Sequence, residues 1–167
     1  MTLTNPSHSW EEEEVENPVG CTQWVYNSIT NELAVLRTVE TADEEDAPWY
    51  DFWYDIESAV LVDGVASICD CAFLHCVKMK SVQIPKSVTS IGDEAFFNCQ
   101  GLKSIKIPDS VEFIEFDAFS QCTFPSIKIP KSVTSFGGNP FFNCFFLREI
   151  DVSENPNFVF VDGVLMN

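Results

Sequence analysis

Apolar and polar residues alternate in short runs through the second half of the chain. The run LKSIKIP (102–108) has the spacing L-x-x-I-x-I, with a lysine between its two isoleucines. This alternation predicts a short strand over 105–107, in which Ile105 and Ile107 point inward and Lys106 points outward. The proline that follows has no N–H to donate and is expected to end the strand.

The same pattern returns at a fixed interval. The segments IPKSVTSIGDEAFFNC (84–99) and IPKSVTSFGGNPFFNC (129–144) agree at twelve of sixteen positions. Phenylalanines and cysteines recur with spacings of 23, 23 and 22 residues, at Phe73, Phe96, Phe119 and Phe141 and at Cys76, Cys99, Cys122 and Cys144. This period predicts a solenoid with one coil per repeat, in which each coil buries its apolar residues against its neighbours.

The rest of each coil follows from the same pattern. The stretch DSVEFI is expected to turn the chain, with Val111 and Ile114 pointing inward. The stretch FDAFSQC is interpreted as a single helical turn that Asp117 caps, with Phe119 and Cys122 buried. Stacked coils bring their strands to about 4.8 Å from one another. The sequence therefore predicts an α/β solenoid with a parallel β-sheet on one face.

The repeat resembles a known family. Its pattern L-x-x-I-x-I-P-x-S-V-T-S-I-G-x-x-A-F-x-x-C is similar to the BspA-like, treponemal-type leucine-rich repeat, and the resemblance covers residues 56–152. It implies a right-handed leucine-rich-repeat superhelix that follows an N-terminal β cap. It also implies a surface protein that adheres to host proteins or to other cells. Pro140 departs from the family pattern, because alanine is usual at that position of the predicted helical turn.

The resemblance and the composition divide the chain into three parts. Residues 1–20 are predicted to be an acidic disordered tail, 21–57 the N-terminal β capping region, and 58–167 leucine-rich repeats of about 23 residues. The final stretch NPNFVFVDGVLMN resembles a variant coil that often follows such repeats. Because the sequence stops there, an uncapped solenoid end is expected.

Charge is distributed unevenly along the chain. The net charge is −17, and residues 1–57 contribute −13 of it, from fourteen acidic side chains and one basic one. This acidity argues against nucleic acid or an anionic membrane as the partner. No apolar run approaches the roughly 18 residues of a membrane span. The N-terminus also lacks the basic and apolar regions of a secretory signal.

A cluster of cysteines raises the alternative of a metal site. The run CDCAFLHC presents Cys69, Cys71, His75 and Cys76, which are residue types that bind zinc. The repeat explains most of them: Cys76 belongs to the cysteine column, and His75 stands where other coils carry Asn or Gln. Only Cys71 has no such explanation. We therefore favour the interpretation that these residues occupy ordinary positions of the repeat over the interpretation that they bind a metal, and no cofactor is predicted.

The cysteine column is predicted to consist of buried thiols. Stacked coils would hold neighbouring Cβ atoms about 5 Å apart, whereas a disulfide needs roughly 3.5–4.5 Å. Buried thiols behave as small apolar side chains. Free thiols favour a reducing compartment, whereas the family resemblance implies a secreted or cell-surface location, so the localisation stays open.

The sequence offers no pattern for catalysis. Its two histidines lie in the predicted tail and at a repeat position, and no phosphate-binding glycine loop or H-E-x-x-H motif is present. The acidic segment Asp43–Asp46 lacks the spaced ligands and the glycine of a calcium loop. We therefore predict that the protein is not an enzyme.

The informative surface is the outward side of the predicted strands. Alignment of the coils places there a set of polar and basic residues, Lys80, Gln83, Lys103, Lys106, Lys128 and Arg148. One interpretation is that exposed lysines keep the sheet soluble and prevent edge pairing. The other is a concave face that docks an acidic segment of a partner protein. The run Glu11–Glu14 is interpreted as a solvated tail, although it could also fold back over this face.

Two functions follow as hypotheses. The first is a non-catalytic protein-binding module of the surface-adhesion type, whose partner is a host or cell-surface protein. The second is a structural segment that associates through its uncapped ends with further coils or with a second copy, as a homo-oligomer or by domain swapping.

Overall fold

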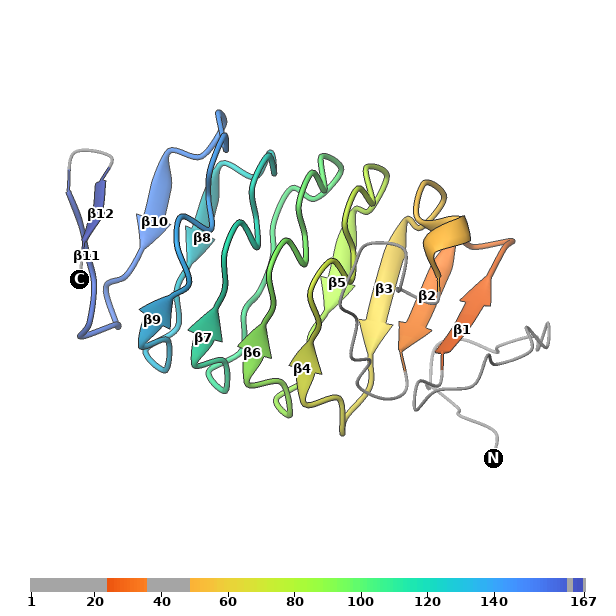
Figure 1. The fold of residues 1–167 in the computed structure, drawn as a ribbon, viewed down its shortest axis with the longest axis horizontal. Coiled ribbons are helices and arrows are strands. Elements are labelled where there is room, and N and C mark those ends of the chain that lie inside the picture. Colours follow the sequence, from red (N-terminus) through yellow and green to blue (C-terminus); the bar gives the residue numbers. More distant parts are fainter. Residues whose placement is uncertain (1–23, 36–48, 162–163, 167) are drawn as a thin grey trace.

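The computed structural model describes residues 24–35, 49–161 and 164–166. The predicted tail (1–20) and the acidic segment 43–46 lie outside these residues. Within the described part, the chain winds into a parallel β-solenoid of about five turns with almost no helix (Figure 1). The predicted solenoid is confirmed, while the hand of its superhelix and the N-terminal cap stay predictions.

Strands at the starts of the coils form a sheet along one side of the solenoid, which we call the first face. They are β1 (Trp24–Asn27), β2 (Glu32–Val35), β3 (Ser58–Leu61), β5 (Ser81–Gln83), β8 (Ser126–Lys128) and β10 (Glu149–Asp151). The first four pair in that order, and β8 pairs with β10. β1 and β2 form an antiparallel hairpin, whereas the other pairs are parallel. The parallel pairing of successive coils confirms the predicted sheet.

A second parallel sheet runs along another side of the solenoid. Its strands are β4 (Ser67–Ile68), β6 (Ser90–Ile91), β7 (Phe113–Ile114) and β9 (Ser135–Phe136), paired in that order. The sequence predicted only a turn here, with Val111 and Ile114 inward. Both side chains are fully buried as predicted. The backbone beside them pairs with the neighbouring coils, so the fold has one more sheet than expected.

The predicted helical turn is replaced by a turn with two left-handed residues. Asp117 and Gln121 adopt φ angles of 51° and 60°, which an α-helix does not accommodate. Two amides of this turn bond to the next coil: Phe119 N donates to Pro140 O at 2.8 Å and Gln121 N to Phe142 O at 2.9 Å. Asp117 is therefore not a helix cap, and the α part of the predicted class is wrong. Pro140 fits this turn, because only its carbonyl is needed.

One helical turn is present in the described part, the 3-10 helix η2 (Tyr50–Phe52). Trp49 precedes it and is buried; its indole N–H donates to the carbonyl of Ala72 at 2.6 Å. The Trp49 ring also stacks on Phe73, with centroids 5.8 Å apart. These contacts join the segment before β3 to the core of the first coil. No helix among the described residues is long and apolar enough to cross a membrane.

The predicted phenylalanine column lies inside the solenoid. The rings of Phe73, Phe96, Phe119 and Phe141 stack with centroid separations of 5.2, 5.5 and 5.9 Å and interplanar angles of 11°, 4° and 9°. The first three rings are buried, and Phe141 is half-buried at the last full coil. The column gives each coil one large apolar side chain that contacts both neighbours.

The predicted cysteine column runs beside the phenylalanines. All cysteines in the described residues are free thiols. The Sγ atoms of Cys99 and Cys122 donate to the carbonyl oxygens of Phe73 and Phe96, each at 3.1 Å. Burial raises the pKa of both thiols, which keeps them protonated as donors. The prediction of buried thiols is confirmed for Cys76, Cys99 and Cys122, whereas Cys144 is half-buried at the last full coil.

One coil departs from the first face. The predicted strand 105–107 keeps its alternation, since Ile107 is buried and Lys106 is exposed, but it is not a strand. In the described part, the backbone of 104–107 forms no hydrogen bond with either neighbouring coil. The prediction of a paired strand here is wrong, because alternation sets side-chain direction but does not bring backbones within hydrogen-bonding distance.

A larger side chain fills the interior after this coil. Phe124 is fully buried in the column that holds Met79 and Leu102 in the two preceding coils. Its ring contacts Phe119 edge-on, with centroids 6.1 Å apart. We attribute the interruption of the sheet to the additional interior volume that this ring requires.

After β10 the chain leaves the regular repeat. The antiparallel hairpin of β11 (Val159–Val161) and β12 (Val164–Met166) closes the described part. Before it, Asn155 is buried beneath the last full coil. Its side-chain NH2 donates to the carbonyl oxygens of Pro130 and Val133, at 2.6 and 2.9 Å. This amide supplies the hydrogen bonds that a further coil would otherwise supply.

Candidate functional site

The residues predicted to bind a partner all have exposed side chains on or directly beside the first face. They are Lys80, Gln83, Lys103, Lys106, Lys128 and Arg148. Successive coils place them in two adjacent columns, as the sequence alignment predicts. Their role in binding a partner stays a prediction, but their surroundings divide them into two groups.

Two lysines of the first face, Lys80 and Lys128, are neutralised. Lys80 Nζ bonds to the Glu57 carboxylate, and Lys128 Nζ lies 2.8 Å from Glu154 Oε1. The hydrogen bond from Lys80 lowers the pKa of Glu57, and the hydrogen bond to Glu154 raises the pKa of Lys128. Exposed pairs of this kind stabilise a fold only weakly, because water screens them. Their main effect is to cancel positive charge locally.

Four other lysines on or beside the first face keep their charge. We define the basic patch as Lys86, Lys103, Lys106 and Lys131. All four are exposed, and none forms an ion pair within the described residues. Lys103 Nζ donates to Thr123 Oγ1 at 2.9 Å and to Gln100 O at 3.2 Å, both of which are neutral groups. Lys103 and Lys106 belong to the coil at which the sheet is interrupted, and Lys86 and Lys131 belong to the two coils that flank it. Arg148, in the coil that follows, also forms no ion pair within the described residues.

A cleft of about 730 Å³ opens at this interruption. It lies between the end of β5 and the segment 106–110 of the next coil. Its polar side chains are those of Gln83, Lys86, Lys106, Asp109 and Ser110, and its floor is apolar. Two of the four lysines of the basic patch thus line a cleft rather than a flat surface.

The CDCAFLHC segment (69–76) forms no metal centre. In the part of the chain that the structure describes, no group of three or more His, Cys, Asp or Glu side chains is placed to hold a metal ion. His75 Nδ1 lies 2.8 Å from Asn98 Nδ2, the amide at the same position of the next coil. The imidazole also packs edge-on against Trp53 and Phe97, at 5.3 and 5.4 Å. It therefore fills a repeat position.

Sequence reasoning missed the ion pairs that neutralise part of this face. Lys80 and Glu57 are 23 residues apart, and so are Lys78 and Asp55, whose Nζ and Oδ1 atoms lie 2.8 Å apart. One repeat period separates the members of each of these pairs, so aligning the coils could have predicted both ion pairs. The cleft could not have been predicted in this way, because it depends on the distance between two coils, which the sequence alignment does not give.

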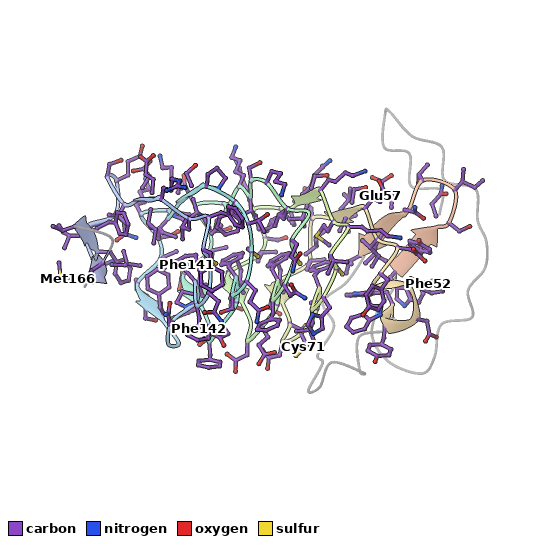
Figure 2. All side chains as sticks on the ribbon, turned by 90° about the horizontal axis from the view of Figure 1, so that it is seen from above. Phe52, Glu57, Cys71, Phe141, Phe142 and Met166 are labelled. Atoms are coloured by element: carbon purple, nitrogen blue, oxygen red, sulfur yellow. The ribbon has the colours of Figure 1, made fainter. Side chains whose placement is uncertain are left out.

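An apolar surface lies at the other end of the described part. A cavity of about 660 Å³ is bounded by the last full coil and the β11–β12 hairpin. The exposed apolar side chains nearby are Phe142, Phe145, Phe146, Val159, Val161, Val164 and Met166. In Figure 2 the labelled Phe142 points outward from the coil, and Met166, on β12, lies at the end of the solenoid. This surface is apolar, in contrast to the basic patch.

Solved structures with the same fold are leucine-rich repeat proteins. The chain is 24% identical to one from Eubacterium ventriosum, over 87% of this chain and 46% of that one, with a TM-score of 0.70. It is 23% identical to one from Bacteroides ovatus, over 81% of this chain and 41% of that one, with a TM-score of 0.59. It is 22% identical to the T. pallidum leucine-rich repeat protein, over 81% of this chain and 70% of that one, with a TM-score of 0.61. The chain spans less than half the length of the first two.

The repeat itself is matched by a family model. The BspA type leucine-rich repeat region matches residues 57–160 in six copies. No curated protein matches the chain. The matched residues cover more than half of the sequence and include the coils whose phenylalanine and cysteine columns build the core. The chain belongs to the BspA-type leucine-rich repeat family.

Proposed function

We propose that the protein is a non-catalytic protein-binding module that docks an acidic segment of a partner protein on its first face. The observation that carries this proposal is the basic patch, whose four lysines keep their charge in a protein with a net charge of −17. A location at the cell surface or in the medium belongs to the same proposal, since the family resemblance implies it.

The arrangement of the lysines favours docking over a purely solubilising role. A lysine that only keeps the sheet soluble has no need to remain without a carboxylate partner, and Lys80 and Lys128 have such partners. The lysines of the basic patch lie on adjacent coils and on the same side, so their fields add. Exposed faces of repeat solenoids are extended surfaces on which partners commonly bind. An acidic partner would gain both steering and contact energy there.

Reversal of two charges in the basic patch tests the proposal. Lys103→Glu with Lys106→Glu is expected to abolish capture of the partner in a pull-down from a cell-surface extract. The melting temperature is expected to change by less than about 2 °C, because exposed charges contribute little to stability. The identified partner is then titrated against both proteins by calorimetry at about 50 and 500 mM salt, where screening separates electrostatic binding from apolar binding.

The matched control adds negative charge to another side of the solenoid. Thr89→Glu with Thr134→Glu alters two exposed threonines beside the second sheet. This variant is expected to keep the partner. Equal loss of binding in both variants, or unfolding of the Lys103→Glu/Lys106→Glu protein, would contradict the docking face.

A second candidate function is structural association through the apolar end. Phe145 is 83% exposed and Phe146 58% exposed, beside the cavity of about 660 Å³. Contiguous exposed apolar side chains of this kind mark association surfaces. The occupant under this hypothesis is a further set of coils or a second copy of the chain.

Salt separates the two candidates. If the apolar end associates with a second copy, sedimentation velocity in about 0.5 M salt is expected to show a dimer, because apolar contacts are not screened. Phe145→Ser with Phe146→Ser should then return the protein to a monomer. The measurement is repeated at protein concentrations up to about 0.1 mM, so that it detects a dimer with a Kd of about 0.1 mM or lower. A monomer at this protein concentration and at every salt concentration would exclude self-association.

A further inference from the structure

The cleft in the first face results from a local separation of two coils. The separation is visible in the hydrogen bonding of one serine that each coil has at the same position. Ser87 and Ser132 donate their hydroxyl protons to carbonyl oxygens of the preceding coil, those of Val65 and Val111, at 2.7 and 2.6 Å. Ser110 occupies the same position in the coil between them. It is the one buried side-chain oxygen among the described residues that has no hydrogen-bond partner.

The backbone beside Ser110 also has unused hydrogen-bonding groups. In regular coils, the amide that precedes the strand bonds to the preceding coil, as Lys80 N does to Glu57 O at 2.7 Å. Its counterpart, the Lys103 amide, and the segment 104–107 form no backbone bond to the preceding coil in the described part. The N–H groups of this segment and the outer edge of β5 are therefore open to hydrogen-bond partners from outside the fold. Unsatisfied groups of this kind favour a polar ligand.

The charges around the cleft select the kind of ligand. Lys86 and Lys106 line it from the two sides of the interruption, and neither forms an ion pair within the described residues. Asp109 lies on the same cleft, so its lining carries a net charge of +1, from two lysines and one aspartate. This balance fits one carboxylate better than a polyanion. The apolar floor, which includes Val82 and Ile107, fits the rest of a peptide.

We propose that this cleft binds a carboxylate side chain of an acidic peptide segment of the partner protein. The Lys86 and Lys106 ammonium groups flank the carboxylate, and the buried Ser110 hydroxyl supplies a further donor when its side chain rotates toward the cleft. The peptide chain lies over Val82 and Ile107. The inference rests on the proposed docking function, and it names the chemistry that the first face recognises.

Fluorescence polarisation with a defined peptide tests the cleft. The probe is a fluorescein-labelled, amide-capped peptide of ten residues in which glutamate and valine alternate. The same peptide with glutamine in place of glutamate is the reference. Lys86→Gln with Lys106→Gln is expected to weaken binding of the glutamate peptide about tenfold, because charge-assisted hydrogen bonds to the carboxylate are lost. The reference peptide is expected to bind both proteins equally weakly.

The repeat supplies a matched control pair. Lys128→Gln with Lys131→Gln removes two lysines from the same two columns, at a coil whose strand is paired. The expected loss is only about twofold to threefold, because these lysines contribute to the general field and not to the cleft. Ser110→Ala should weaken binding about threefold without lowering the melting temperature, because the hydroxyl that it removes has no partner in the free protein.

The outcomes separate the cleft from the docking face. Equal losses for the two lysine pairs would overturn the cleft and leave the docking face in place. Unchanged binding by the Ser110→Ala protein would exclude the hydroxyl as a donor and would also count against the cleft. If the glutamate peptide binds no better than the glutamine peptide, the docking face and the cleft both fall.

Discussion

Replacement of Phe96 by alanine is expected to lower the free energy of unfolding by about 3–5 kcal/mol. The Phe96 ring is fully buried and stacks on both Phe73 and Phe119, at 5.2 and 5.5 Å. Its removal leaves a cavity between two coils, and neither neighbour can close it without giving up its own stacking. Because each coil is stabilised mainly by its neighbours, the loss is expected to reduce cooperativity as well. Urea denaturation followed by circular dichroism measures both effects.

The control is a phenylalanine that lies on the surface. Phe142 is 51% exposed, and Phe142→Ala is expected to cost less than about 1 kcal/mol. Losses of equal size in the two variants would mean that the column is not the main source of stability. A large loss only for Phe96→Ala is the result that the stacked core requires.

The second large effect is expected at Asn155. Its side-chain NH2 bonds to two carbonyl oxygens of the last full coil, those of Pro130 and Val133. Alanine at this position would remove two buried hydrogen bonds, at about 0.5–1.5 kcal/mol each, although each acceptor keeps one other donor: Val133 N for Pro130 O and Asn157 Nδ2 for Val133 O. We expect a total loss of about 1–3 kcal/mol. Asn155→Asp should be worse, because it places a carboxylate oxygen opposite two carbonyl oxygens.

A neighbouring asparagine gives the comparison. Asn157 is exposed and makes one longer bond, from its Nδ2 to Val133 O at 3.1 Å. Asn157→Ala is expected to cost less than about 1 kcal/mol, since water can replace the bond. Hydrogen exchange of the amides in coil 126–148 reports where the stability is lost. Equal protection in the Asn155 and Asn157 variants would show that the buried amide does not hold this coil.

The candidate site was predictable in part. The outward columns with Lys103 and Lys106 follow from the alternation of the repeat, and the structure places both side chains in solvent. The pairing of Lys80 with Glu57 was also within reach of the sequence, because one repeat period separates them. The unpaired Ser110 hydroxyl was not, since its counterparts Ser87 and Ser132 share its I-P-x-S-V context and are bonded.

The turns show why the predicted helix failed. The stretch FDAFSQC has an acidic residue followed by apolar residues at helical spacing, and this pattern alone favours a capped helical turn. In the solenoid, the amides of Phe119 and Gln121 find carbonyl acceptors in the next coil, at 2.8 and 2.9 Å. Bonds between coils thus replace bonds within a helix. A prediction that considers one coil alone has no access to them.

The sequence by itself determined the period, the inward phenylalanine and cysteine columns, and the outward lysines. It could do so because stacked identical coils require the same side chain in the same direction at each repeat. Only the tertiary structure decided which backbones pair, which lysines find a carboxylate, and where two coils separate. Those features depend on small differences in the distance between coils, because a hydrogen bond or ion pair is lost when its two groups move a few tenths of an ångström to a few ångströms apart.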